Sequence, residues 1–178
     1  MDRFKKWAQK EFSFWQRFLA TLLAGVIFVF LIPFGLVVLA PRLDQRLMLS
    51  LIPFGSVVLV ISVLMILFGF AFAMWSIFAQ LLYARGTPLP IMATQELLVS
   101  GPFRYCRNPM SFGTILVYLG IGLLVRSWSA LGAGLIFSGL LIVYLKMIEE
   151  RELAIRFGDK YLEYKQETSF LIPRFLRR

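Results

Sequence analysis

Two long runs without a charged residue limit the possible folds of this chain more than any other feature. No Asp, Glu, Lys or Arg lies between Arg17 and Arg42, and none lies between Arg46 and Arg85. Each run exceeds the roughly 20 apolar residues that a helix needs to cross a bilayer. Because 59% of the 178 residues are hydrophobic and only 16% are charged, a water-soluble core of this size cannot bury them all. The sequence therefore predicts an all-α fold, a polytopic membrane helix bundle.

The two runs predict the first two of about four membrane-spanning helices. The first helix is expected from Phe18 to Ala40, and it is too long to be the core of a cleavable signal peptide. The second run exceeds the length of one simple crossing. We expect a single long helix from about Leu51 to Tyr83, although a helix preceded by an interfacial stretch around Pro53 also fits the pattern.

Two shorter spans are expected to form a tight hairpin. They run from Pro109 to Val125 and from Trp128 to Lys146, and only Arg126 and Ser127 separate them. Small residues let membrane helices approach closely. We therefore expect the two arms to pack through glycines, namely Gly113, Gly120 and Gly122 on one arm and Gly132, Gly134 and Gly139 on the other.

The basic residues predict the orientation of the spans. The segments before the first span, between the second and third, and after the fourth hold most of the lysines and arginines, whereas the opposite loops hold only Arg42, Arg46 and Arg126. Basic residues concentrate on the cytoplasmic side of membrane proteins. Both termini are therefore expected in the cytoplasm. The aromatic and basic residues 4–17 are expected to anchor the chain in the headgroup layer.

Composition also disfavours several classes of function. The net charge of +9 follows the positive-inside pattern, so nucleic-acid binding is not expected. The chain has no histidine and one cysteine, Cys106, which excludes imidazole chemistry and an intrachain disulfide, and no metal is expected. The spans hold almost no ionisable residue, whereas a transporter or proton pump usually places an acid or base at mid-depth, so transport is not expected. Polar residues gather instead in two predicted cytoplasmic blocks.

The first polar block, residues 86–111, contains a helix start. Asn is a favoured N-cap residue and proline is favoured at the first helical position, so Asn108 and Pro109 predict the beginning of the third span. Free backbone N–H groups at such a start suit an anionic group, and Arg104 and Arg107 lie just before it. Plain interfacial anchoring explains the two arginines equally well.

The second polar block, residues 146–152, lies where the fourth helix leaves the membrane. We expect this helix to continue through Phe157, with Gly158 as its C-terminal cap. Glu149 and Glu150 should point about 100° apart, so one can face the hairpin and the other a neighbouring element. A solvated helix face is the alternative. A short helix is expected in the tail, residues 159–178.

Several short sequence motifs, most of them within these two blocks, occur together in one known family. They are Gly101-Pro102-Phe103-Arg104-Tyr105-Cys106-Arg107-Asn108-Pro109, then Glu149-Glu150, then residues 157–165 and finally Pro173. In this order, residues 84–175 resemble the integral-membrane methyltransferase family that includes isoprenylcysteine carboxyl methyltransferases and phospholipid N-methyltransferases. The family pattern is Gly-Pro-Tyr-Arg-Tyr-x-Arg-His-Pro-x-Tyr. Phe103, Asn108 and Ser111 depart from it, and Asn108 cannot titrate as histidine does.

The length of the chain suggests a single membrane domain over residues 1–178, with two generic spans in 1–83. The resemblance implies an S-adenosylmethionine pocket in residues 84–178. By resemblance, Arg107 and Glu150 are the expected catalytic residues. The expected cofactor contacts are Gln95, Glu96, Leu97, Leu98, Gly101, Phe103, Asn108, Pro109, Met110, Ser111 and Glu149.

The expected activity is methyl transfer to a lipophilic carboxylate, thiol or amine. One of the two glutamates would hold the ammonium or ribose of the cofactor, and Arg107 with the helix start would hold its carboxylate. Because the chain lacks histidine, an acceptor that is already anionic is slightly favoured. Two alternatives stay open, a non-catalytic scaffold or lipid-binding protein and a nicotinamide-dependent membrane reductase.

Overall fold

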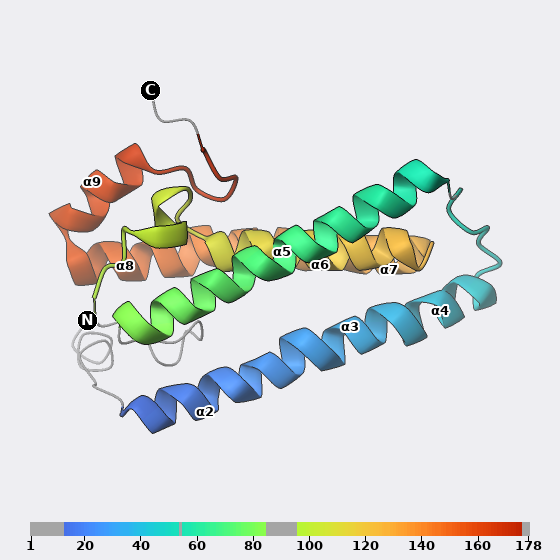
Figure 1. Ribbon diagram of the computed structural model, residues 1–178, viewed down its shortest axis with the longest axis horizontal. Coiled ribbons are helices and arrows are strands. Elements are labelled where there is room, and N and C mark those ends of the chain that lie inside the picture. The colour runs from blue at the N-terminus through green and yellow to red at the C-terminus, as the bar shows by residue number, and fades with distance from the viewer. Residues whose placement is uncertain (1–12, 54, 85–95, 176–178) are drawn as a thin grey trace.

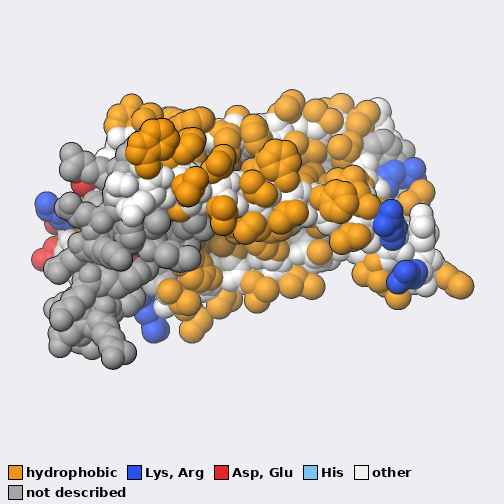
Figure 2. All heavy atoms as spheres, turned by 90° about the horizontal axis from the view of Figure 1, so that it is seen from below, with side chains coloured by type: hydrophobic (Ala, Val, Ile, Leu, Met, Phe, Trp, Pro, Cys, Tyr) orange, Lys and Arg blue, Asp and Glu red, His pale blue; other side chains and the backbone are white. Residues whose placement is uncertain are grey.

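The computed structural model describes residues 13–53, 55–84 and 96–175, and their regular segments are all helical (Figure 1). Within these described ranges, three helices are long and apolar enough to cross a membrane, and the shorter apolar helix Pro109–Leu124 packs among them. Hydrophobic side chains cover the length of the visible face, and charged side chains gather at its two ends (Figure 2). The predicted helical bundle is confirmed, and the protein is an integral membrane protein.

The first span is one continuous composite helix. Its segments are α2 (Phe14–Gly25), η1 (Val26–Leu31), α3 (Ile32–Phe34), η2 (Gly35–Leu39) and α4 (Ala40–Arg46). The π-helical turns η1 and η2 each lie just before a proline, Pro33 or Pro41. A proline ring clashes with the carbonyl four residues earlier, and a wider π turn relieves this clash. The helix therefore continues to Arg46, beyond the predicted end at Ala40.

The second span, α5 (Ser56–Tyr83), begins later than predicted. The expected single helix from Leu51 is wrong, because the described residues 51–53 and 55 are not helical. The Ile52 N–H donates to the Arg126 carbonyl at 3.2 Å, and Arg126 Nε donates to the Ile52 carbonyl at 2.9 Å. These bonds hold the stretch extended against the hairpin turn. The alternative with a separate stretch around Pro53 describes this region better.

The C-terminal half follows the predicted order. It contains α6 (Pro109–Leu124), α7 (Trp128–Tyr144), the π-helical turn η4 (Leu145–Glu149), α8 (Glu150–Phe157) and α9 (Asp159–Glu167). The tight hairpin, the continuation to Phe157 and the short tail helix are confirmed. Gly158 has φ +56°, a left-handed conformation that favours glycine at a helix C-terminus.

Glycine packing differs from the prediction. The closest approach joins α5 to α6, where a Cβ on Gly113 would lie 2.4 Å from the Gly69 carbonyl oxygen. Within the hairpin, Gly122 and Gly134 do face the other arm. Gly132 and Gly139, in contrast, meet no described atom within 4 Å. The prediction of hairpin packing is thus wrong for these two glycines on α7, and also for Gly113 and Gly120, which α6 places against α5.

Alternating helix directions bring several segments to one end of the bundle. The start of α2, the end of α5, the start of α6, and both α8 and α9 lie there (Figure 1). The placement of this end in the cytoplasm stays a prediction. Residues 4–12 of the predicted anchor lie outside the described residues, as does Gln95, and the headgroup role of the whole anchor stays a prediction.

Candidate active site

A cavity of about 770 Å³ lies between the first span and the helices α5, α6 and α7. Its volume is within the range of roughly 300–1,000 Å³ that is usual for small-molecule pockets. Its mouth, which we define by Thr21, Gln80, Asn108 and Glu149, lies at the end of the bundle that carries α8 and α9. From there the cavity reaches down α6 as far as Ile121.

This cavity brings together most of the predicted site residues. The residues that line it include Glu96, Leu97, Leu98, Phe103, Arg107, Asn108, Pro109, Met110, Ser111, Glu149 and Glu150. Gly101 is absent from the lining and instead packs beside the ring of Trp75, with φ +59°. Gln95 lies outside the described residues. The grouping makes a shared site sterically possible, whereas the binding of a cofactor by these residues stays a prediction.

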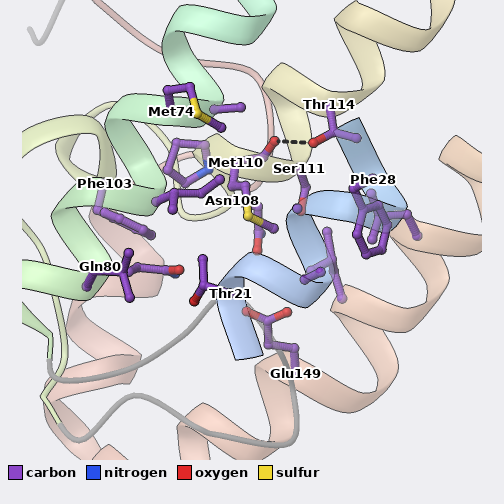
Figure 3. Close-up of a pocket in the computed structure, with 18 of the residues that line it drawn as sticks. Thr21, Phe28, Met74, Gln80, Phe103, Asn108, Met110, Ser111, Thr114 and Glu149 are labelled. Atoms are coloured by element: carbon purple, nitrogen blue, oxygen red, sulfur yellow. Dashed lines mark hydrogen bonds between the residues drawn. The ribbon is translucent and has the colours of Figure 1, made fainter. Parts of the chain in front are cut away.

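The mouth carries polar groups that the described protein leaves unsatisfied. The Glu149 carboxylate points into the cavity (Figure 3) and has no hydrogen-bond or ion-pair partner among the described residues. Thr21 Oγ1 and Gln80 Oε1 are buried and also lack a partner in the described part of the chain. Leaving such an atom unpaired costs about 1–3 kcal/mol. The mouth therefore suits a ligand that brings hydrogen-bond donors.

Glu150, the next residue, is fully engaged by the protein. Its Oε1 accepts from an Arg107 terminal nitrogen at 2.6 Å, and its Oε2 accepts from Lys165 Nζ at 2.7 Å. The Arg107 and Glu150 side chains are only 10% and 11% exposed. The expected divergence of the two glutamates is thus observed, because Glu149 faces the cavity while Glu150 faces Arg107 and α9.

Arg107 ties the tail to the loop before α6. Its other terminal nitrogen donates to the carbonyls of Lys165 and Thr168, and its backbone N–H donates to the Ser169 carbonyl at 2.8 Å. Its Nε has no partner among the described residues. We call Arg107, Glu150, Lys165 and the tail residues 168–170 the clamp. The terminal nitrogens expected to hold a ligand carboxylate therefore bind the protein itself.

The Asn108 side chain also binds the tail. Its Nδ2 donates to the Phe170 carbonyl at 2.9 Å, and its side chain makes no capping hydrogen bond to α6. The prediction that Asn108 occupies the N-cap position is therefore confirmed, whereas its side chain turns to the tail and does not cap the helix. Pro109 does occupy the first helical turn, as expected.

Further bonds hold the tail against residues 103–106. The Tyr164 hydroxyl donates to the Phe103 carbonyl at 2.6 Å, and the Arg174 N–H donates to the Tyr105 carbonyl at 3.0 Å. Burial raises the pKa of the Tyr164 hydroxyl. Cys106 beneath this cover is fully buried, and burial raises the pKa of its thiol to about 12. A thiol with such a pKa is largely protonated and unreactive at neutral pH.

Sequence reasoning missed several polar residues that line the cavity, among them the following four. Two are Thr21 and Gln80, which lie in spans read only as generic membrane helices. The others are Glu152 and Arg156, which pair at 3.4 Å and were treated as part of a solvated face. A usable signal existed for the first two, because a polar side chain inside a charge-free run usually faces the bundle interior.

Comparisons with known proteins agree with this geometry. Residues 57–160 match the family model described as phospholipid methyltransferase. The match includes α5, which the earlier resemblance did not cover. The chain is also similar to methanethiol S-methyltransferase 1 of Bradyrhizobium diazoefficiens, at 37% identity over 37% of this chain and 27% of that relative. The chain thus spans only about a quarter of the curated relative that it matches. Since the family model covers more than half of the sequence, the chain belongs to the phospholipid methyltransferase family of integral-membrane methyltransferases.

Proposed function

We propose that this protein transfers a methyl group from S-adenosylmethionine to a lipophilic acceptor inside the cavity. The observation that carries the proposal is the single cavity that has an unsatisfied polar mouth and a deep apolar end. Family membership supports methyl transfer as the reaction class. The excess of basic residues supports a mouth that faces the cytoplasm.

The residues of the mouth fit the proposed cofactor. S-adenosylmethionine has an ammonium group and two ribose hydroxyls, which are hydrogen-bond donors. Glu149 offers a free carboxylate, and Thr21 and Gln80 offer buried oxygens that lack donors among the described residues. An ammonium beside Glu149 would form a charge-assisted hydrogen bond, which is about twice as strong as a neutral one.

The other residues orient the reactants and keep water out. Phe103 and Met110 supply apolar surface near the mouth, where a flat aromatic group can pack. Arg107 and Glu150, expected as catalytic residues, act in this proposal through the clamp, which fixes the tail beside the mouth. When bound, S-adenosylmethionine supplies an electrophilic methyl group, whose transfer needs mainly alignment and a dry pocket.

The acceptor is proposed only as a class. The matching family is named for the methylation of phospholipids, and the similar protein is named for the methylation of methanethiol. Amine and thiol acceptors are therefore both candidates. A carboxylate or thiolate acceptor needs no base. An ammonium acceptor first has to lose a proton. In the described mouth, the Glu149 carboxylate is the group that could accept this proton.

Calorimetric titration of S-adenosylhomocysteine into the purified protein tests the proposal. We expect saturable binding to the wild type and at least about tenfold weaker binding to Glu149→Gln, since one charge-assisted bond is lost. Glu163→Gln is the matched control, because Glu163 is an exposed glutamate on α9, and it should bind like the wild type. Absence of binding to the wild type, or equal binding to all three proteins, would overturn the proposal.

A further inference from the structure

The apolar part of the cavity is deep and has a defined end. On α6 the lining extends from Asn108 to Ile121, which corresponds to about 20 Å along the helix axis. Beyond Thr114, the residues of α6 that line the cavity are Val117, Tyr118 and Ile121, and those of α7 are Phe137, Leu141 and Tyr144. All of these except the two tyrosines are apolar. The mouth accounts for the polar groups of a cofactor, so the deeper half is left for an apolar group.

Three aromatic side chains lie across the deep part of the cavity, about one helical turn before Ile121, its last lining residue on α6. The ring of Phe137 lies 5.1 Å from that of Tyr118 and 6.3 Å from that of Phe28, measured between ring centroids. All three residues line the cavity, and we call them the floor. Tyr118 is 1% exposed and also belongs to a packed cluster with Leu36 and Ala130. The floor therefore rests on close-packed protein.

A hydrogen bond fixes the floor in place. The Tyr118 hydroxyl donates to the Phe28 carbonyl at 2.8 Å. Phe28 lies in the π-helical turn η1, and π turns are frequent at functional sites because they disturb the regular helical bonding. The bond ties the first span to α6 across the deep part of the cavity. Phe28 is thus held in position relative to the rest of the floor.

We propose that the floor sets the maximum length of the apolar chain that the methyl acceptor carries. This inference rests on the proposed function. Phe28 and Phe137 determine specificity by contact with the chain end, and Tyr118 positions Phe28. A chain in a bilayer gains no hydrophobic energy by moving into an equally apolar cavity. Chain length therefore matters only when the chain end meets the rings, since close-packed side chains resist extra methylenes.

A series of n-alkanethiols, from butanethiol to hexadecanethiol, tests the limit in nanodiscs. Each thiol is added at a fixed mole fraction of the lipid. Two readouts are taken, the rise in melting temperature and the incorporation of labelled methyl from S-adenosylmethionine. For the wild type we expect a level response up to one chain length and an apparent affinity about tenfold lower beyond it.

Variants of the floor should move this limit. Phe137→Ala should accept chains longer by about two to four carbons, since the lost ring leaves a cavity. Phe28→Ala should act in the same direction, and its ring is 40% exposed, so folding is less at risk. Tyr118→Phe removes the hydrogen bond to the Phe28 carbonyl and should shift the limit. Ile136→Ala is the matched control, because Ile136 is 66% exposed beside Phe137.

The two readouts separate failure of the inference from failure of the proposed function. The inference is overturned by a limit that is the same in all variants, by the absence of any limit, or by the absence of stabilisation at every length. Methyl incorporation with an unmoved limit overturns the inference alone. A limit that moves without any methyl incorporation supports the inference and counts against the proposed function.

Discussion

Glu149 and Glu150 are neighbours in the sequence, yet they belong to two differently built regions. Glu150 lies in the clamp, where Arg107 and Lys165 satisfy both carboxylate oxygens at 2.6 and 2.7 Å. Glu149 lies in the mouth, where no described residue pairs with it. We propose that this difference is functional, with Glu150 completing the fold and Glu149 left for a ligand. Substitutions in the two regions should therefore have opposite effects on stability and on binding.

Breaking the clamp should have the largest effect on stability. Arg107→Ala leaves the buried Glu150 carboxylate with Lys165 as its remaining cation partner, and breaking a buried pair costs about 3–5 kcal/mol. We expect a lower free energy of unfolding and a tail that separates from residues 103–106. The alkylation rate of Cys106 measures this, because it is the single cysteine and is fully buried.

Glu149→Gln provides the contrast for the clamp experiment. It removes no contact among the described residues, so Cys106 should stay as protected as in the wild type. Equal alkylation rates in Arg107→Ala and the wild type would show that the tail does not depend on the clamp.

Adding a methyl group at the close contact between α5 and α6 should have the next largest effect on stability. Both regions depend on this contact, because α5 carries Gln80 of the mouth and α6 starts beside the clamp. A methyl group on Gly113 would lie 2.4 Å from the Gly69 carbonyl oxygen. Gly113→Ala should therefore destabilise the protein by about 1–3 kcal/mol, measured by thermal unfolding in detergent.

A second glycine serves as the control for this substitution. Gly139→Ala in α7 meets no described atom within 4 Å, and alanine has the higher helix propensity by about 1 kcal/mol. Its melting temperature should be unchanged or raised. If both alanine variants melted alike, the close contact between α5 and α6 would not exist.

Asn108→Ala should have a smaller effect, confined to the tail. The substitution removes the bond to the Phe170 carbonyl, which is worth about 1 kcal/mol. Hydrogen exchange should increase at residues 168–172, whereas the first turn of α6 should keep its protection, because Asn108 makes no side-chain cap there. Loss of protection in that first turn instead would restore the capping role expected from the sequence.

Thr21→Val should have the smallest effect on stability and a clear one on binding. The substitution removes a buried hydroxyl that lacks a partner among the described residues, so the melting temperature should not fall. Affinity for S-adenosylhomocysteine should decrease about fivefold, as expected for one neutral hydrogen bond. Unchanged affinity together with a lower melting temperature would place Thr21 outside the mouth.

Local patterns in the sequence were enough to predict much of this architecture. Charge-free runs marked the spans, and Pro109 and Gly158 marked a helix start and a helix end. The late start of α5 was not predictable, because it depends on hydrogen bonds between Ile52 and the distant Arg126. Long-range partners of this kind leave no local pattern in a single sequence.

Many residues of the candidate site could also be predicted from local sequence patterns, whereas their long-range partners could not. Its residues near the start of α6 and the end of the fourth span were found through a resemblance, and the structure places them around one cavity. Their roles depended on the tail, which takes the hydrogen bonds of Arg107 and Asn108 that a ligand was expected to receive. Thr21 and Gln80 were missed because their importance comes from the packing of the first two spans around the mouth.

The melting temperatures of Glu149→Gln and Glu150→Gln, each with and without S-adenosylhomocysteine, test the division between mouth and clamp most directly. Glu149→Gln should melt like the wild type without the ligand and lose most of the rise that the ligand causes, since stabilisation follows affinity. Glu150→Gln should melt at a lower temperature without the ligand and still show a rise when the ligand is added. If the two variants behaved alike, or if Glu149→Gln kept the full rise, the assignment of Glu149 to the ligand and Glu150 to the fold would be wrong.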